Sequence, residues 1–341
     1  MNKRRLVKVF CLMAAFSLLF CFSVNISSAQ SIEISYANFF PPTHVQSQLP
    51  ESWCKELEKR TNGKVKTTYY PGGTLLAPAK MFSGILDGIA DVGTSVIGYT
   101  PGFFPAMQAI DLPMGYPSAH VATKVINDFY NKFKPKNLSK VKVMYFHAHG
   151  PGILHSKKPV RKLEDLRGMK VRSYGFNAKM TSALGAVPVA MPQSGVYEAL
   201  QKGVADATIA PMEVLKGWKQ GEVVKATTQC YSVGYTAGFF VVMNIDKWNS
   251  LPKDVQRTIE QLNKEWVGKY GDAWEKSDQE GLEFTRSLGN EVIPLSDAEN
   301  ARWAKAVAPV VDAYIKDVTG KGLPGQDYVD FIRAKIKEYS K

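Results

Sequence analysis

Apolar and polar positions along the first hundred residues follow two periods in turn, one typical of strands and one typical of amphipathic helices. Leu49, Trp53 and Leu57 recur at every fourth position, which predicts a helix with one apolar face. Short apolar runs before and after this helix predict strands. The expected elements are strands at 32–39, 65–70 and 90–96 and helices at 45–60 and 79–88. This β-α-β-α-β order predicts a parallel sheet that is covered by helices.

The alternation of strands and helices continues in the rest of the chain. The expected elements are strands at 141–147, 169–172, 188–191, 207–209 and 239–244, and helices at 121–133, 163–166, 177–184 and 194–202. A helical pattern then runs from Pro252 to about Gly289 with no further proline, which exceeds a typical globular helix and predicts one helix along two lobes. Two last helices are expected at 296–318, which Ser296 and Glu299 open with a capping-box pattern, and at 326–339.

The expected fold is α/β with two lobes, because 341 residues can form two cores. No linker tract is present in the sequence. The lobes are therefore expected to be joined by strands that cross between them. The predicted division is residues 30–150 and 240–280 in lobe I, and residues 151–239 and 281–341 in lobe II.

Two similar loops, Gly88-Ile-Ala-Asp91 and Gly203-Val-Ala-Asp206, each lie between a predicted helix and a predicted strand. One interpretation is a common loop in which glycine ends the helix and aspartate turns the chain. The other is that the two lobes are related, and the matching order of elements favours it.

The N-terminus is typical of a secretory signal peptide at residues 1–29. Basic residues 3–5 precede an apolar run at 9–24, and small residues follow at 27–29. A membrane anchor is the alternative, but the apolar run is short for a span. No later run of about 18 apolar residues occurs. We therefore expect export to the periplasm of a protein that does not span the membrane after signal removal.

Charge and cysteine content narrow the choice of partner. The net charge of +12 falls to about +8 without the four basic residues of the signal peptide. The chain contains no long Lys/Arg run and no nucleic-acid-binding motif, so a small anionic ligand is favoured over nucleic acid or an anionic membrane. Cys54 and Cys230 remain after cleavage, and either a disulfide or two buried thiols is compatible with the sequence.

Enzyme motifs are missing from the sequence. It has no G-x-S-x-G elbow, no Walker A loop and no H-E-x-x-H pair. His147 and His149 would share one face of a strand, with His155 nearby. A metal site, a histidine satisfied at a strand end and a donor in a cleft are all compatible with this spacing. No acid or cysteine lies close in sequence, so we expect no metal and no cofactor.

Arg172 ends a predicted strand and is the main candidate for ligand binding. Ligands of open α/β sheets bind beyond the carboxyl ends of strands, and a guanidinium suits a bidentate carboxylate. The alternative is a solvated strand face shared with Lys170. The position of Arg172 among buried elements favours anion binding.

Short motifs occur in a fixed order between residues 40 and 206. They are FPPTH at 40–44, EKRTNGKV at 58–65, YPGGTL at 70–75, GIAD at 88–91, LRGMKVR at 166–172, VYEALQ at 196–201 and GVAD at 203–206. In this order they resemble the solute-binding proteins of tripartite ATP-independent periplasmic (TRAP) transporters, of the DctP type.

The resemblance implies a type II-like periplasmic binding protein that closes around its ligand and delivers it to a membrane permease driven by an ion gradient. It implies that Arg172 binds a ligand carboxylate. Three positions depart from relatives: Gly152 in place of a second arginine, Ala210 in place of an asparagine, and Gln193 in place of an aromatic residue.

These departures argue against sugar acids and favour a monocarboxylate with an aromatic, heteroaromatic or 2-oxo body. Besides Arg172, the expected ligand-binding residues are Phe39, Phe40, His44, Ser95, Tyr99, His147, His149, Tyr174, Gln193, Met212 and Phe239. Two other function classes remain: a secreted enzyme acting on a small carboxylate with His147 or His149 as base, and a ligand-sensing subunit. No nucleophile–base–orienter set can be assembled from the sequence, which disfavours an enzyme.

Overall fold

The computed structural model describes residues 31–341, so the predicted signal peptide at 1–29 lies outside the described residues. The first group of elements comprises β1 (Ile32–Asn38), α2 (Val45–Arg60), β2 (Val65–Tyr70), α3 (Met81–Leu86), β3 (Val92–Val96), α4 (Ala119–Phe133), β4 (Val141–Ala148), β10 (Gly238–Asn244) and α8 (Ile245–Ser250). Their strands form one sheet in the order β2-β1-β3-β10-β4, which defines lobe I.

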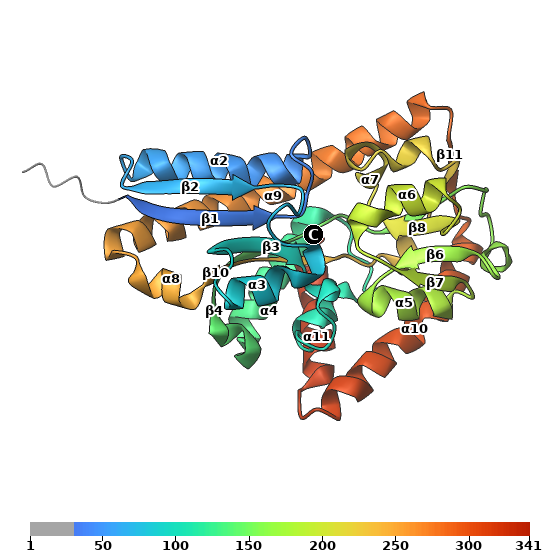
Figure 1. Cartoon of the computed structure of the whole chain (residues 1–341). Helices are drawn as coiled ribbons and strands as arrows, with labels where there is room; N and C mark the ends of the chain where they lie inside the picture. The colour runs from blue at the N-terminus through green and yellow to red at the C-terminus, as the bar shows by residue number, and fades with distance from the viewer. Residues whose placement is uncertain (1–30) are drawn as a thin grey trace, which may run out of the picture.

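A second sheet defines lobe II. Its elements are β5 (Ile153–Ser156), β6 (Lys170–Ser173), α5 (Gly175–Ala183), β7 (Val187–Ala190), α6 (Val196–Gln201), β8 (Ala207–Ala210), α7 (Val214–Gly217), β9 (Ala226–Gln229) and β11 (Glu291–Pro294). The strand order is β11-β9-β5-β8-β6-β7. The two sheets lie side by side, each with its own covering helices (Figure 1). The predicted two-lobed α/β fold is confirmed.

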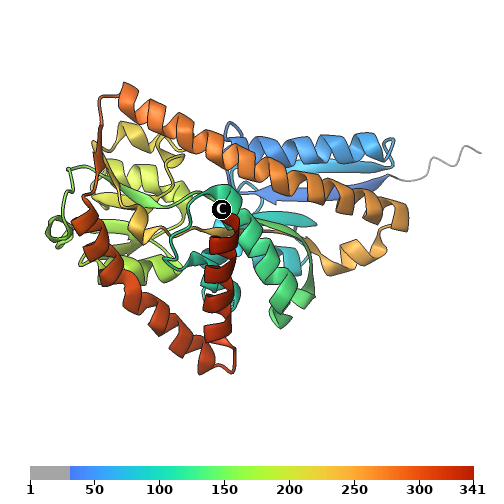
Figure 2. The same cartoon turned by 180° about the vertical axis from the view of Figure 1, so that it is seen from behind.

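Helix α9 (Lys253–Ser287) extends along both lobes, as the long proline-free pattern predicts. It contacts α2, α4 and β4 of lobe I, and α7 and β11 of lobe II. Figure 2 shows it crossing the back of the molecule from one lobe to the other. Its buried face includes Ile259, Trp266, Tyr270 and Trp274, so the apolar period of the sequence is the face that packs on the lobes.

Two connections between strands cross from one lobe to the other, at 149–152 and 230–237, and they pair with each other. The Gly152 N–H donates to the Tyr235 carbonyl at 2.9 Å. A Cβ on Gly152 would lie 1.9 Å from the Tyr235 ring. The position at which some relatives are expected to carry an arginine is therefore restricted to glycine here, because Tyr235 fills the space.

The two similar loops have the same geometry. Gly88 and Gly203 both adopt positive φ, at 72° and 74°. The Asp91 carboxylate accepts from the Ser35 N–H at 2.8 Å, and the Asp206 carboxylate accepts from the Lys170 N–H at 2.9 Å. In each lobe the aspartate therefore ties the loop to the neighbouring parallel strand, so the sequence similarity has a local structural cause in both lobes.

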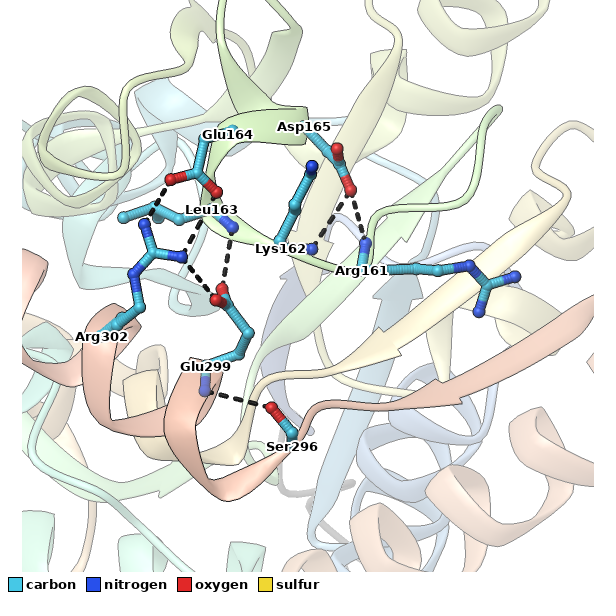
Figure 3. A network of polar contacts seen from close by, with 8 residues as sticks. All are labelled: Arg161, Lys162, Leu163, Glu164, Asp165, Ser296, Glu299 and Arg302. Carbon is cyan, nitrogen blue, oxygen red and sulfur yellow. Dashed lines mark hydrogen bonds and ion pairs between the residues drawn. The ribbon is translucent and has the colours of Figure 1, made fainter.

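The last helices, α10 (Asp297–Thr319) and α11 (Gly325–Tyr339), return the chain to lobe I. The Ser296 hydroxyl caps α10 by accepting from the Glu299 N–H at 3.3 Å. The Glu299 carboxylate does not complete the predicted capping box; it accepts from the Leu163 N–H at 3.0 Å, and Arg302 joins it to Glu164 (Figure 3). This network holds the start of α10 on lobe II.

At its other end the C-terminal pair packs on lobe I. Helix α11 contacts α4, where the Tyr328 and Phe129 rings lie 5.1 Å apart. The residue limits expected for the two lobes stay a prediction. In residues 31–341 no helix combines the length and the apolar character needed to cross a membrane.

Cys54 and Cys230 are both buried and free. Cys54 lies in the core of lobe I and Cys230 in the core of lobe II. Burial raises the pKa of each thiol to about 12. Of the two alternatives compatible with the sequence, the structure has two buried thiols.

Candidate ligand-binding site

A cavity lies between the lobes, where about 340 Å³ is not filled by protein atoms, open solvent at its edge included. Its wall is lined by Phe39, Phe40, Val96, Tyr99, His149, Arg172, Tyr174, Gln193, Ala210, Pro211, Glu213, Val214, Trp218, Tyr235, Ala237, Phe239 and Trp274. These residues come from both lobes, from the crossing segments and from α9, so the cavity forms only where these parts meet.

Arg172 enters the cavity from the end of β6. It is only 2 % exposed, which excludes the alternative of a solvated strand face. Its Nε donates to the Met191 carbonyl at 3.1 Å and its Nη2 donates to the Tyr99 hydroxyl at 3.1 Å. No carboxylate of residues 31–341 forms an ion pair with it. A buried charge without a counter-charge is unfavourable, so this guanidinium is suited to an anion that comes from outside the chain.

Two further donors lie next to Arg172. The Tyr99 hydroxyl oxygen accepts from Arg172 and also from the Gln193 N–H at 2.9 Å. Since it accepts from both, its own hydrogen remains free to donate. The side-chain nitrogen of Gln193, Nε2, has no acceptor among the described residues. Together these groups can hold a carboxylate through several hydrogen bonds.

Aromatic rings make up most of the remaining wall. The Phe39 ring is parallel to the Phe239 ring, at 6.5 Å and 5°, and close to parallel to the Trp218 ring, at 6.3 Å and 19°. Trp274 packs on Phe239 at 5.3 Å. Flat rings at these separations favour a planar or apolar ligand body.

His149 lines the cavity, but both of its ring nitrogens are used inside the protein. Nδ1–H donates to the Gly150 carbonyl, and Nε2 accepts from the Ala237 N–H at 3.0 Å. Burial lowers the pKa of His149 to about 4. The ring is therefore neutral near pH 7 and fits the expectation of a satisfied histidine at a strand end.

His147 and His155, the two histidines near His149 in the sequence, lie outside the wall of the cavity. His147 stacks on Tyr270 at 4.0 Å, and its Nδ1 accepts from Trp274 Nε1 at 3.1 Å. Burial lowers the pKa of His147 well below its usual value. His155 bonds to the Thr227 hydroxyl and to two backbone carbonyls. Within residues 31–341, no three His, Cys, Asp or Glu side chains gather as metal ligands do.

The structure brings most of the expected residues together around the cavity. The exceptions are His44, Ser95, His147 and Met212, which do not line it. Ser95 donates to the Pro78 carbonyl at 2.8 Å, and Met212 packs in the core of lobe II. His44 bonds to Glu213 at 2.8 Å. Each of these side chains is buried against other parts of the protein. The spacing of apolar residues and the position along the chain do not reveal this.

Sequence reasoning missed four prominent wall residues: Glu213, Trp218, Tyr235 and Trp274. Trp274 belongs to the apolar period of α9, which predicts a core position and conceals its place at the cavity. Trp218 and Glu213 flank the four-residue helix α7, for which no period can be recognised. The proline that precedes this turn, Pro211, was the available signal, because chain reversals beyond strand ends commonly carry ligand contacts.

Two lobes around a central cavity with a buried, unpaired arginine define the class of two-lobed solute-binding proteins. The chain belongs to the DctP family, since the family model described as "bacterial extracellular solute-binding protein, family 7" matches residues 36–317. The resemblance to the solute-binding proteins of TRAP transporters is confirmed.

Individual relatives bind different organic acids. The chain is 27% identical to the C4-dicarboxylate-binding periplasmic protein DctP of Rhodobacter capsulatus, over 83% of this chain and 86% of the relative. It is 26% identical to a TRAP solute-binding protein of Rhodoferax ferrireducens, solved with copurified benzoate, with a TM-score of 0.86 over 91% of this chain and 99% of the other. A marine metagenome protein specific for aromatic acid ligands, solved with metahydroxyphenylacetate, is 27% identical, with a TM-score of 0.86 over 91% and 100%.

Proposed function

We propose that this protein captures a small monocarboxylate with an aromatic, heteroaromatic or 2-oxo body between its lobes, in the periplasm, and delivers it to the permease subunits of a TRAP transporter. The observation that carries the proposal is Arg172, a buried guanidinium with no carboxylate partner among residues 31–341. It lies in a cavity whose wall is mostly aromatic.

The polar groups of the cavity support one strongly bound carboxylate. Arg172, Tyr99 and Gln193 provide donors at one place, and Gly152 leaves no room for a second arginine beside Tyr235. The relatives solved with benzoate and with metahydroxyphenylacetate bind ligands of this type. A dicarboxylate, by contrast, would bring a second charge close to the Glu213 carboxylate.

The histidines support binding over catalysis. An enzyme acting on a carboxylate would need His147 or His149 as a base. Both ring nitrogens of His149 are bonded inside the protein, and His147 lies outside the cavity wall. We therefore infer that the bound acid is released unchanged.

Thermal unfolding of the exported chain in a panel of acids tests the proposal, because a ligand that binds the folded state raises the unfolding temperature. Benzoate, nicotinate and phenylpyruvate are expected to raise it, whereas succinate and glucuronate are not. Stabilisation by dicarboxylates or sugar acids alone would contradict the proposal. Recovery of the stabilising acid after incubation, checked by mass spectrometry, distinguishes binding from turnover.

A further inference from the structure

Glu213 places a half-satisfied carboxylate in the wall of the cavity. It is 2 % exposed and lies at the start of α7 in lobe II. Its Oε2 accepts from His44 Nε2 of lobe I at 2.8 Å. Its Oε1 forms no hydrogen bond with any of residues 31–341. Glu213 lines both the cavity and an outer groove, so this oxygen can accept from a donor on a ligand in the cavity.

His44 forms one hydrogen bond with Glu213 and uses its other ring nitrogen within its own segment. Its Nδ1 accepts from the Gln46 N–H at 3.1 Å, at the start of α2. Since Nδ1 acts as an acceptor, the ring donates to Glu213 Oε2 through Nε2. His44 therefore satisfies Oε2 of Glu213 and leaves Oε1 without a donor.

The groups behind Glu213 do not supply a donor to Oε1 either. Its backbone N–H donates to the Asp278 carboxylate at 2.8 Å, which is another acid. Three lysines line the outer groove with Glu213: Lys216 and Lys276 pair with Glu280, and Lys219 forms no ion pair among the described residues. Among the described residues, Arg172 and Glu213 are thus the charged groups of the cavity wall, one of each sign.

The two charges occupy different parts of the wall. Arg172 contacts Tyr99, whose ring lies 6.0 Å from Phe39 on one side. Trp218 lies 6.3 Å from Phe39 and 5.6 Å from His44, the partner of Glu213. The Trp218 Nε1–H has no acceptor among residues 31–341. The part of the wall beside Glu213 therefore offers an acceptor, Glu213 Oε1, and a donor, Trp218 Nε1–H, neither of which has a partner among residues 31–341.

We propose that the ligand carries a hydrogen-bond donor, a hydroxyl or an ammonium group, that binds Glu213 while its carboxylate binds Arg172. This rests on the proposed function, since it takes an organic acid as the occupant. An unsubstituted monocarboxylate leaves Glu213 unpaired and gives the cavity a net negative charge. A hydroxyl group can donate to Glu213 Oε1 and accept from Trp218 Nε1, and an ammonium group balances the charge. Glu213 is thus a specificity-determining residue.

Isothermal titration of the exported chain with substituted benzoates tests the inference. The donor-bearing probes are the 3- and 4-hydroxy and 3- and 4-aminomethyl acids, and the matched probes without a donor are the 3- and 4-methoxy and methyl acids. The best donor-bearing acid is expected to bind at least about tenfold more tightly than its matched partner. Whether the hydroxyl or the ammonium series is preferred identifies the donor.

Glu213→Gln removes the charge and keeps the shape, so it is expected to reduce this ratio at least about fivefold. Glu198→Gln, which changes an exposed acid of lobe II that pairs with Lys202, is the matched control and should leave the ratio unchanged. If donor-free acids bind the wild-type protein as tightly as donor-bearing ones, the inference is overturned and the proposed function stands. If neither these benzoates nor the nicotinate and phenylpyruvate of the thermal panel bind, the proposed function itself fails. Should Glu213→Gln not fold, the wild-type ratio alone decides.

Discussion

His44 of lobe I and Glu213 of lobe II meet in a buried hydrogen bond of 2.8 Å, between the ligand cavity and an outer groove. Glu213 lines both spaces, whereas His44 lines only the groove. Separation of the lobes at this point requires this bond to break. A Cβ on Gly217 would lie 2.5 Å from His44 Nε2 and 2.6 Å from Glu213 Oε2, so the absence of a side chain at Gly217 lets the two residues meet.

The first prediction concerns this bond and the closed state. His44→Ala is expected to weaken the binding of benzoate by about 1–3 kcal/mol, because it leaves a buried carboxylate without its donor. The loss should appear as faster dissociation in stopped-flow measurements. Benzoate has no donor group for Glu213, so its affinity reports closure and not the ligand contact proposed for Glu213.

A double-mutant cycle that combines His44→Ala with Glu213→Ala measures the interaction between the two residues apart from the effect of each change alone. The two single changes and the double change are expected to be non-additive by at least about 1 kcal/mol. His120→Ala is the control, because His120 pairs with Asp272 at 3.2 Å on the surface. Additive effects at His44 and Glu213 would show that the bond does not contribute to ligand retention.

The second prediction concerns the close approach of α9 to lobe II. A Cβ on Gly281 would lie 2.1 Å from the Met212 carbonyl oxygen and 3.1 Å from the Glu213 Cα. Gly281→Ala is therefore expected to lower the free energy of unfolding by about 1–3 kcal/mol, since backbone must move to accommodate the methyl group. Urea denaturation measures the change.

Gly268 lies in the same helix, and a Cβ added there would have no other atom within 4 Å, so Gly268→Ala is the matched control. It is expected to raise stability by about 0.5–1 kcal/mol, because alanine is the better helix former. Equal effects at the two positions would mean that α9 does not approach lobe II this closely.

The third prediction concerns pH and Asp111, a buried acid near the crossing segments. Its Oδ1 accepts from the Gly238 N–H at 3.0 Å, and its Oδ2 has no partner among the described residues. Burial raises the pKa of Asp111 to about 7. Between about pH 4 and pH 7 the folded protein keeps a proton that the unfolded chain releases, so stability falls as pH rises through this window.

Asp111→Asn removes this titration. The free energy of unfolding of wild type minus that of Asp111→Asn is expected to fall between pH 4 and pH 8, by up to about 4 kcal/mol. The difference is the quantity to follow because the buried histidines, whose pKa values are lowered, give a slope of opposite sign in both proteins. A difference that stays constant with pH would place the pKa of Asp111 at its ordinary value.

The elements that sequence reasoning predicts well are those whose own residues decide them. Helix α9 has a continuous apolar face, and the Gly88 and Gly203 loops contain the glycine and aspartate that their geometry requires. Strand β9 was missed because its threonines look polar. They are fully buried: Thr227 bonds to His155, and the Thr228 hydroxyl donates to the Val160 carbonyl at 2.7 Å.

Cavity residues, too, are predictable only where local sequence marks them. Arg172 is recognisable because a strand end and a family motif both mark it. Glu213 and Trp274 reach the cavity through contacts with segments more than a hundred residues away, such as Glu213 with His44 and Trp274 with His147. The spacing of apolar residues in one sequence carries no information about such contacts. The acidic residue of the cavity wall, Glu213, could therefore not be predicted.

The central claim is that Arg172 binds the carboxylate of the ligand. Isothermal titration of the acid that stabilises the wild-type protein most, repeated with Arg172→Lys and Arg172→Gln, tests it most directly. Arg167→Gln, an exposed arginine of the same segment, is the control. Arg172→Gln is expected to lose at least about tenfold in affinity, and Arg172→Lys to lose less because it keeps the charge without the bidentate geometry. Circular dichroism should show that both variants are folded. Wild-type affinity in folded Arg172→Gln would contradict the account.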